Sequence, residues 1–543
     1  MRRWNVYDRV GPEVNNPSQT MGMFLAEAYQ RVAQLQVVLN NDPMQMEFVE
    51  QQVKELFDLG AGLCLTGMIA NSMNSKEHDK RCEETRLEYA IPLRSGHERQ
   101  VEVHLGAGYI SYATTIYCQP KSPSASDQEH TPGLDIDLSQ YGFSENVSPW
   151  LVSKVSRCVA LAPSLDQAYI ELQRDGIHLT RTTIDRIVSQ AGSESLTVRE
   201  RMLEQFERGE MKQGCEFAGK RVSVQIDGGR TRTRGVLEPI DPVENFGKTQ
   251  SEVAGTPSAG RSKEMRRSNR FQADWREPKL LIIYAHDDHG RKDESVRVLI
   301  DGSFGDADYM ERLISMHLHR LGANKAKTIT FNSDGAAWIW GRIDSILAKS
   351  KVGSEVVVSQ VLDVCHAVEN LSKSLQSLGR SANATTEDEA SNSNELRSRL
   401  RDGQWSHVVD VLTNRLDGAE GLSMPDRAEV KRVIGYIQGH GESGRLDYPK
   451  FKLMGLPLGS GSIESAIRRV INLRMKNNGT FWRIQKAEKI LSIRSSILSG
   501  RWDEDRTEVK RQMKLNRKQA IPKLDESPRP KSDARLKSRN SND

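Results

Sequence analysis

The stretch 221–230, Arg-Val-Ser-Val-Gln-Ile-Asp-Gly-Gly-Arg, most constrains the fold of this chain. Apolar and polar side chains alternate from Val222 to Asp227, which is typical of a half-buried β-strand. The strand ends on a carboxylate followed by two glycines, which have no Cβ and let backbone or a bound phosphate chain approach closely. Because a lone Asp at a strand end is commonly a turn or cap residue, its function can be inferred only from similar positions elsewhere.

Two later strands and one later helix carry acidic residues of the same kind. The stretch 328–334 is an alternating strand that ends in Asp334-Gly, and 356–366 is a strand that ends in Asp363-x-x-His366. The stretch 458–465 opens a helix that carries Glu464. The expected faces of that helix are Ile463, Ala466, Ile467, Val470 and Leu473 on the apolar side, and Glu464, Arg468 and Arg469 on the polar side. Glu464 is therefore either a functional carboxylate or the i,i+4 partner of Arg468.

The order of these elements predicts the fold class. From 221 onward the pattern reads strand–Asp, two strands, helix, strand–Asp, helix, strand, and then a helix bearing Glu. This is the order of an α/β fold with an RNase H-like mixed sheet, in which such acids converge at one edge. Three carboxylates without a Cys or His ligand set are hard oxygen donors, which suit Mg²⁺ or Mn²⁺. Two such ions would polarise a phosphodiester and stabilise the leaving oxygen.

Composition sets broad limits on the protein. A length of 543 residues predicts three or four domains, and a hydrophobic content of 37% suits a soluble globular protein. Lys and Arg number 77 against 73 Asp and Glu, so net charge alone indicates no partner. No apolar run of about 18 residues predicts a membrane span, and the N-terminus lacks a secretory signal. The six cysteines include no Cys-x-x-Cys pair, which favours a reducing cytoplasm and does not indicate zinc.

Two regions have the composition of nucleic-acid contacts. The stretch 164–190 predicts a helix, a turn at Asp-Gly-Ile, and a second helix capped by Thr180. Its expected outward and inward residues are, respectively, Arg181 and Arg186, and Ile184, Ile187 and Val188. This pair is either a helix–turn–helix or a plain αα-hairpin. The second region places Arg230, Arg232 and Arg234 on one strand face, suited to phosphate or simply to a solvated edge.

Five motifs together resemble those of bacterial insertion-sequence DDE transposases, with the Kra-type family the nearest match and the Mutator-like group related in pattern. They are Gln-Ile-Asp227-Gly-Gly-Arg-Thr-Arg, Asp274-Trp-Arg-Glu-Pro-Lys, Ser-Asp334-Gly-Ala-Ala-Trp-Ile-Trp, Leu-Asp363-Val-Cys-His-Ala-Val-Glu-Asn-Leu and Gly-Ser-Gly-Ser-Ile-Glu464-Ser. The match covers roughly residues 85 to 500.

The resemblance implies a function and roles for individual residues. It implies that Asp227, Asp334 and Glu464 form the catalytic triad and hold two Mg²⁺ or Mn²⁺ ions. His366 is either a further catalytic residue or a buried partner of Asp363. The implied reaction is cleavage at transposon ends followed by strand transfer into target DNA. The implied partners are terminal inverted repeats, target DNA and further copies of the chain on DNA, in the cytoplasm of a bacterium and at its nucleoid, with no membrane.

The expected domains follow from the patterns and the resemblance together. In order they are 1–85, an N-terminal helical region; 86–132, a small β region and linker; 133–200, a helix–turn–helix-like DNA-binding region; 215–366, the first part of the catalytic core; 367–455, a helical insertion; 456–500, the last core helix with Glu464; and 501–543, a basic disordered tail. The DNA-binding residues expected are Arg181, Arg186, Arg230, Arg232, Arg234, Arg468 and Arg469.

Two other functions fit the same sequence: a catalytically silent DNA-binding regulator descended from a transposase, and a structure-specific nuclease.

Overall fold

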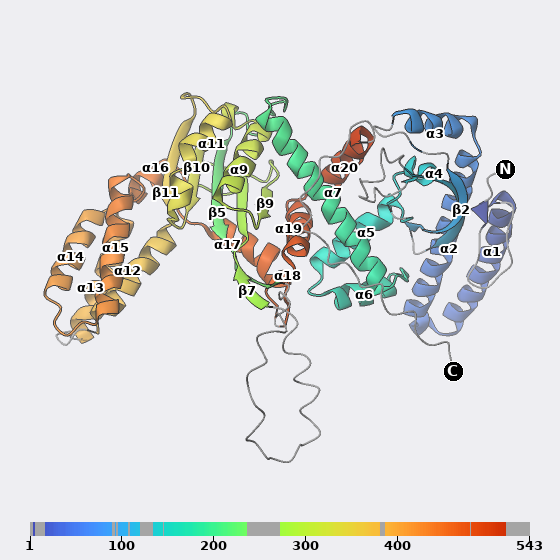
Figure 1. Cartoon of the computed structure of the whole chain (residues 1–543). Helices are drawn as coiled ribbons and strands as arrows, with labels where there is room; N and C mark the ends of the chain where they lie inside the picture. The colour runs from blue at the N-terminus through green and yellow to red at the C-terminus, as the bar shows by residue number, and fades with distance from the viewer. Residues whose placement is uncertain are drawn as a thin grey trace, which may run out of the picture. The chain divides into compact units, whose positions relative to one another are not determined.

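The computed structural model describes residues 4–5, 17–88, 93, 96–106, 109–119, 134–144, 146–235, 272–380, 386–477 and 479–516 (Figure 1). The chain divides into two compact units. Unit 1 comprises Met1–Pro149 and Val509–Asp543, and unit 2 comprises Trp150–Glu508. The boundary falls inside the expected segment 133–200, because its first helix, α4 (Ile136–Ser139), packs on a strand of unit 1.

Unit 1 combines long helices with a small antiparallel sheet. Its helices are α1 (Pro17–Asn41), α2 (Met46–Met73) and α3 (Lys76–Glu88). Its strands are β1 (Trp4–Asn5), β2 (His97–His104), β3 (Ile110–Cys118) and β4 (Leu134–Asp135), with β3 pairing with each of the other three. The helical region expected before the strands is present, although the two-residue strand β1 precedes it. Pro43 separates α1 from α2, where it starts a 3₁₀ turn capped by Asp42.

One helical stretch of unit 1 is unusually apolar. Among the described residues, only Pro43–Met73 is long and apolar enough to cross a membrane by length and composition, with a mean hydropathy of 1.3. A core helix passes the same test, so a single stretch of this kind is weak evidence for a membrane span.

Unit 2 is built on a five-stranded mixed sheet. Its strands, in chain order, are β5 (Arg221–Gly228), β8 (Lys279–His286), β9 (Leu299–Ser303), β10 (Thr328–Ser333) and β11 (Val357–Leu362). Their order in the sheet is β11-β10-β5-β8-β9. β10 runs parallel to both neighbours, whereas β5, β8 and β9 are antiparallel in turn. The carboxyl ends of β5, β10 and β11 therefore meet at one edge of the sheet.

Helices cover the sheet and extend from it. They include α5 (Pro149–Leu161), α7 (Arg181–Glu207), α9 (Ala307–Leu321), α10 (Ala337–Trp340), α11 (Ile343–Lys349) and α19 (Ile484–Leu498). A helical bundle follows β11, comprising α12 (Val364–Leu378), α13 (Thr386–Arg401), α14 (Trp405–Asp417), α15 (Met424–Glu442) and α16 (Tyr448–Leu453). Figure 1 shows this bundle beside the β11 edge. One apolar core runs from the sheet into the bundle, because Phe331 of β10 and Ile437 of α15 belong to the same buried cluster.

The helix that carries Glu464 departs from the expected regular helix. It consists of α17 (Gly461–Ile467), a π-helical turn over Arg468–Asn472 and α18 (Leu473–Met475). The side chains of Ile463, Ala466, Ile467 and Val470 are buried as predicted. Leu473 was predicted to share their face but is 54% exposed, because the wide π turn changes the helical phase before it.

The segment after 501 begins with a helix, which corrects the expectation of a disordered tail for its first part. Helix α20 (Trp502–Asn516) is anchored by Trp502, which is buried and donates from Nε1 to Ser153 Oγ at 2.7 Å. Arg506 adds a buried ion pair with Glu194 at 2.8 Å. A few anchoring contacts therefore order a stretch whose composition is too polar to predict a core helix. Residues 517–543 lie outside the described residues.

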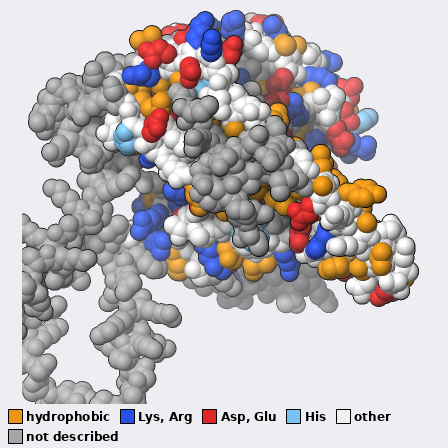
Figure 2. Space-filling model, turned by 90° about the vertical axis from the view of Figure 1, so that its right-hand side faces the viewer, with side chains coloured by type: hydrophobic (Ala, Val, Ile, Leu, Met, Phe, Trp, Pro, Cys, Tyr) orange, Lys and Arg blue, Asp and Glu red, His pale blue; other side chains and the backbone are white. Residues whose placement is uncertain are grey.

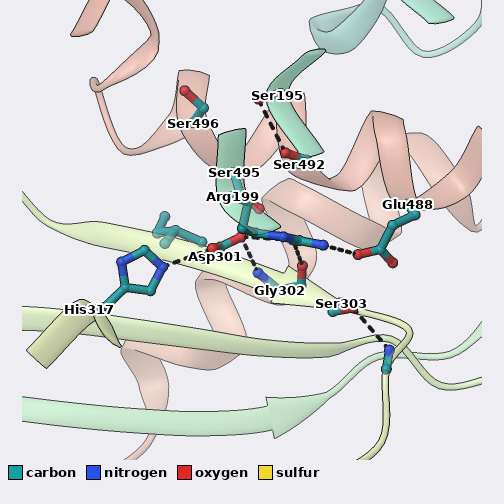
Figure 3. A network of polar contacts seen from close by, with 12 residues as sticks. Ser195, Arg199, Asp301, Gly302, Ser303, His317, Glu488, Ser492, Ser495 and Ser496 are labelled. Carbon is teal, nitrogen blue, oxygen red and sulfur yellow. Dashed lines mark hydrogen bonds and ion pairs between the residues drawn. The ribbon is translucent and has the colours of Figure 1, made fainter. Parts of the chain in front are cut away.

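A buried polar network ties the β9 edge of the sheet to the helices around it (Figure 3). Arg199 of α7 lies between Asp301 of β9, at 3.5 Å, and Glu488 of α19, at 2.5 Å. His317 of α9 contacts the other side of Asp301 at 2.9 Å. Burial alone would lower the pKa of Arg199, but the two carboxylates outweigh it and raise that pKa. Arg199 therefore bridges Asp301 and Glu488 directly.

This network makes stability depend on pH through His317. Burial lowers the pKa of His317 to about 4, although Asp301 acts in the opposite direction. In the unfolded chain its pKa is about 6.5, so between these values the unfolded state binds a proton that the folded state does not. We expect the free energy of unfolding to fall by on the order of 3 kcal/mol as the pH drops from about 6.5 to about 4.

Urea unfolding at a series of pH values across that window measures this effect. His317→Gln retains an amide donor toward Asp301 but does not titrate, so its stability should depend less steeply on pH than that of the wild type. Equal slopes for the two proteins would show that His317 is not the titrating group.

Candidate active site

Three aspartates stand at neighbouring strand ends of unit 2. Asp227 is the next-to-last residue of β5, while Asp334 directly follows β10 and Asp363 directly follows β11. Because these strands are parallel neighbours in the sheet, their acidic ends lie at the same edge. The structure thus places two of the predicted catalytic acids, and the acid of the Asp-x-x-His element, along one edge.

Glu464 is brought to this edge by β5. Gln225 of β5 donates from Nε2 to Gly459 O at 3.2 Å and accepts from the backbone N–H of Ile463 at 3.1 Å. These two hydrogen bonds hold the start of α17 against the sheet. Glu464 is exposed, and its Oε1 accepts a hydrogen bond from Ser460 Oγ at 3.0 Å. Among the described ion pairs Glu464 has none with Arg468, so the helix-partner role proposed from the sequence is not seen.

The electrostatics of Asp227 show that the predicted acids act on one another. Burial, together with the negative charges of Asp334 and Glu464, raises the pKa of Asp227 to about 6. The Gly228 N–H and His366 act in the opposite direction. A carboxylate surrounded in this way is strained by like charge. The arrangement favours a bound cation, which would relieve the repulsion.

Asp363 and His366 form a pair within the same site. His366 Nδ1 lies 3.2 Å from Asp363 Oδ1, close enough for an ion pair but without the alignment of a hydrogen bond. This contact with Asp363 raises the pKa of His366 to about 9, although burial opposes the increase, and the charges of Asp334 and Asp227 add to it. His366 therefore carries a positive charge that partly neutralises the acids. It is neither fully buried nor a simple core residue, since its side chain is 30% exposed.

The oxygens of Asp363 are already engaged. Oδ1 accepts from the backbone N–H of His366 at 2.7 Å, which caps α12, and Oδ2 accepts from the backbone N–H of Ser460. Burial alone would raise the pKa of Asp363, but hydrogen bonds from His366 and Ser460 outweigh it and lower that pKa. Asp363 thus positions both His366 and the loop before Glu464.

A tight group of ligand-type atoms differs in membership from the predicted triad. The ligand atoms of Asp363, His366 and Glu464 all lie within 4.8 Å of one another. Both oxygens of Asp363 accept a backbone hydrogen bond, whereas Asp227, Asp334 and Glu464 each have an oxygen that accepts none of those described. These three are therefore the more available oxygen donors for dications.

The helical bundle contributes residues to the site that the sequence does not reveal. Tyr436 of α15 donates from its hydroxyl to the backbone oxygen of Asp334 at 2.9 Å. Gly335 has a φ of 97°, and a Cβ built there would lie 2.6 Å from the Tyr436 ring and 3.0 Å from His440 Nε2. Burial, with Arg445 nearby, lowers the pKa of His440 to about 4. No spacing rule connects residues about a hundred positions apart, so only folding brings them together.

The predicted arginine face lies on a separate two-stranded ribbon. In β6 (Thr231–Gly235), which pairs with β7 (Gln272–Arg276), the threonines are buried while the arginines point outward. The cation–π distances to the Trp275 ring are 5.6 Å for Arg230 and 5.0 Å for Arg232. The ribbon therefore presents guanidinium groups and an exposed aromatic ring on one side. Arg234 is exposed at its end.

The helix pair predicted over 164–190 is present with the expected cap. It consists of α6 (Leu165–Arg174) and α7, in which Thr180 accepts from the N–H of Thr183 at 3.1 Å. α7 is 27 residues long, so it extends far beyond the short second helix that was expected. Arg181 is engaged within the pair, at 2.6 Å from Asp166 and stacked on Tyr169.

The remaining predicted residues are near the site but differ in exposure. Arg468 is exposed and Arg469 is half-buried, both on the π turn that follows Glu464. Trp340 is buried. A Cβ at Gly229 would lie 2.6 Å from Ile471 Cδ1, so the glycine allows this side chain to pack closely against the backbone.

No family model, curated protein or solved structure matches this chain. Any assignment of function therefore depends on the residues and geometry of the chain itself.

Proposed function

We propose that this chain is a DDE-type DNA transposase that cleaves DNA at transposon ends and joins the freed 3′-hydroxyl to target DNA. The observation that carries the proposal is the placement of Asp227, Asp334 and Glu464 at one sheet edge, where the charges of Asp334 and Glu464 add to burial in raising the pKa of Asp227. The order of elements agrees with the RNase H-like core expected from the sequence. The five motifs supply the specific resemblance on which the DNA substrate is inferred.

The proposal requires a metal site, and the donors fit one. Asp227, Asp334 and Glu464 would hold two Mg²⁺ or Mn²⁺ ions, which would polarise the scissile phosphodiester and stabilise the oxygens on either side. Of the four acids at this edge, only Asp363 accepts backbone N–H groups on both oxygens, and the other three are those predicted from the sequence. His366, positively charged beside them, would contact phosphate oxygens, and Asp363 would hold it in place.

Basic surfaces near the site are the proposed contacts with DNA. The β6–β7 ribbon offers Arg230, Arg232 and Arg234 together with Trp275, a combination suited to phosphate and base stacking. Arg468 and Arg469 lie on the π turn that follows the helix carrying Glu464. On the face shown in Figure 2, Lys and Arg side chains are interspersed with Asp and Glu. Because the net charge of the chain is only +4, we assign binding to the local clusters near the site and not to a general positive charge.

A strand-transfer assay tests the proposed function. Purified protein would be incubated with Mg²⁺, a supercoiled target and DNA carrying the terminal repeats that flank its gene. A transposase cleaves the ends and joins pre-cleaved 3′-ends to the target. A structure-specific nuclease would cleave without joining, and a silent regulator would bind without either reaction, so either result would overturn the proposal.

End recognition is proposed for the α6–α7 pair, with Arg181 and Arg186 as the base-reading residues. Both are exposed, and Arg181 also contacts Asp166 and Tyr169. We expect Arg186→Ala to weaken binding to transposon ends by about 1–3 kcal/mol while changing non-specific binding less. Competition binding at fixed salt, with end DNA and random DNA, measures both. An equal loss for both DNAs would make Arg186 a phosphate contact.

A further inference from the structure

Unit 1 contains a buried cluster of metal-ligand side chains far in sequence from the acids of unit 2. His78 and Cys82 lie four residues apart on α3, so they share one face of that helix. Asp137 of α4 faces them. Asp137 and His78 are fully buried, and Cys82 is 5% exposed.

The three side chains converge on one point. His78 Nε2 lies 2.9 Å from Asp137 Oδ1 and 3.3 Å from Cys82 Sγ, and Cys82 Sγ lies 3.7 Å from Asp137 Oδ1. A tetrahedral Zn²⁺ with sulfur at about 2.3 Å and nitrogen or oxygen at about 2.0–2.1 Å requires ligand-to-ligand distances of about 3.3–3.6 Å. The observed distances lie within about 0.4 Å of these values, so small side-chain adjustments suffice to admit the ion.

The surrounding hydrogen bonds orient two of the ligands. The Tyr141 hydroxyl lies 2.8 Å from Ser72 Oγ and 3.1 Å from His78 Nδ1. With a cation bound at Nε2, the His78 ring would carry its proton on Nδ1 and donate it to the Tyr141 oxygen. The second oxygen of Asp137 accepts from the backbone N–H of Ile116 at 2.7 Å. Metal-binding histidines and carboxylates are commonly held by such outer hydrogen bonds.

We propose that His78, Cys82 and Asp137 bind one structural Zn²⁺ ion, with Cys118 as the fourth ligand. Cys118 ends β3, is fully buried, and belongs to the same apolar cluster as Cys82. Its sulfur is not among the three mutually close ligand atoms, so the Cys118 side chain would have to move toward them to bind the ion. A thiolate, an imidazole and a carboxylate together suit zinc better than Mg²⁺.

The site would join three segments of unit 1 that share little core. The ion would crosslink α3 and α4 to the end of β3. The buried apolar cluster at this place comprises Cys82, Leu93, Cys118 and Ile136. Small cores of this kind gain much of their stability from a metal or a disulfide. The absence of a Cys-x-x-Cys pair hides the site in the sequence, because its ligands come from separate elements. The inference does not depend on the proposed transposase activity.

Metal analysis of the full-length protein tests the site. The wild type, purified without added metal and dialysed, should contain about one zinc per chain by inductively coupled plasma mass spectrometry. Cys82→Ser, His78→Gln and Asp137→Asn should each lower this content at least about tenfold, and Cys118→Ser should lower zinc affinity by about 10–100-fold. Cys158→Ser, which removes a thiol of unit 2, is the matched control and should retain the ion.

Cobalt substitution of the wild type keeps the test decisive if a variant fails to fold. Co²⁺ bound by a thiolate should produce an absorption band from sulfur-to-cobalt charge transfer, and added Zn²⁺ should remove it. A wild-type protein with neither zinc nor this band would show that the cluster is only a buried His–Asp pair. Full zinc retention by both Cys82→Ser and His78→Gln would also overturn the proposal.

Discussion

Asp227→Asn, Asp334→Asn and Glu464→Gln should each reduce DNA cleavage and strand transfer by at least about a hundredfold while leaving DNA binding intact. Each change keeps the shape of the side chain and removes one proposed metal-binding charge. Both reactions should fail together, because one metal site serves both. Binding should persist or tighten slightly, since a charge that repels phosphate has been removed.

The same substitutions should not destabilise the protein, which separates loss of chemistry from loss of fold. Asp227 is half-buried and repelled by Asp334 and Glu464, so a neutral side chain removes an unfavourable interaction. In the wild type, Gly228 N–H donates to Asp227 Oδ1 at 2.6 Å, and the amide oxygen of the Asn variant can accept the same hydrogen bond. We therefore expect thermal unfolding of Asp227→Asn to occur at the wild-type temperature or above it.

Glu369→Gln is the matched control for the three acids. Glu369 lies three residues after His366, is exposed, and pairs with Lys373 at 3.0 Å on the surface of α12. Its loss should leave both reactions unchanged, because Glu369 is not a proposed metal ligand and an exposed ion pair contributes little to stability. A Glu464→Gln protein that still cleaves DNA with Mg²⁺ would contradict the assignment of Glu464 and return Asp363 to consideration as the third ligand.

Arg199→Ala should lower the free energy of unfolding of unit 2 by about 3–5 kcal/mol, because it leaves two carboxylates buried without their shared cation. The Arg199 side chain is only 9% exposed, and it also donates to Gly302 O at 2.9 Å. Removing it would uncouple α7 and α19 from the β9 edge of the sheet. Urea unfolding at about pH 7 measures the loss directly.

Arg208→Ala, at the end of the same helix, is the control. Arg208 is 67% exposed and lies 3.9 Å from Glu204, so its removal should change stability by less than about 1 kcal/mol. Equal effects of the two substitutions would mean that Asp301 and Glu488 are solvated or neutralised without Arg199. The network would then be incidental to the stability of the sheet.

The local features of the catalytic region could be predicted because they depend on neighbouring residues in the chain. Alternating apolar side chains place one face of each strand in the core, and this alternation located the strands that end at Asp227, Asp334 and Asp363. The cap at Thr180 was predictable for the same reason, since a side chain and the N–H groups that follow it are adjacent. The role of Asp363 could not be predicted, because its second backbone partner, Ser460, is 97 residues away in the sequence.

Errors arose where local regularity was assumed. Leu473 was assigned to the buried face of a continuous helix, but the π turn at 468–472 changes the phase before it is reached. The segment after 501 was judged by its polar composition, whereas burial of Trp502 decides that it begins with a helix. In both cases tertiary contacts outweighed the average properties of the segment.

The sequence by itself determined which residue types occupy the ends of the strands and the start of the late helix, because backbone periodicity assigns them locally. Only the tertiary structure decided which of these residues meet. It brought Tyr436 and His440 from the helical bundle to Gly335, and it gathered His78, Cys82 and Asp137 from two helices into one buried cluster. Such meetings depend on how whole elements bury their apolar faces against each other, which the spacing of residues along the chain does not specify.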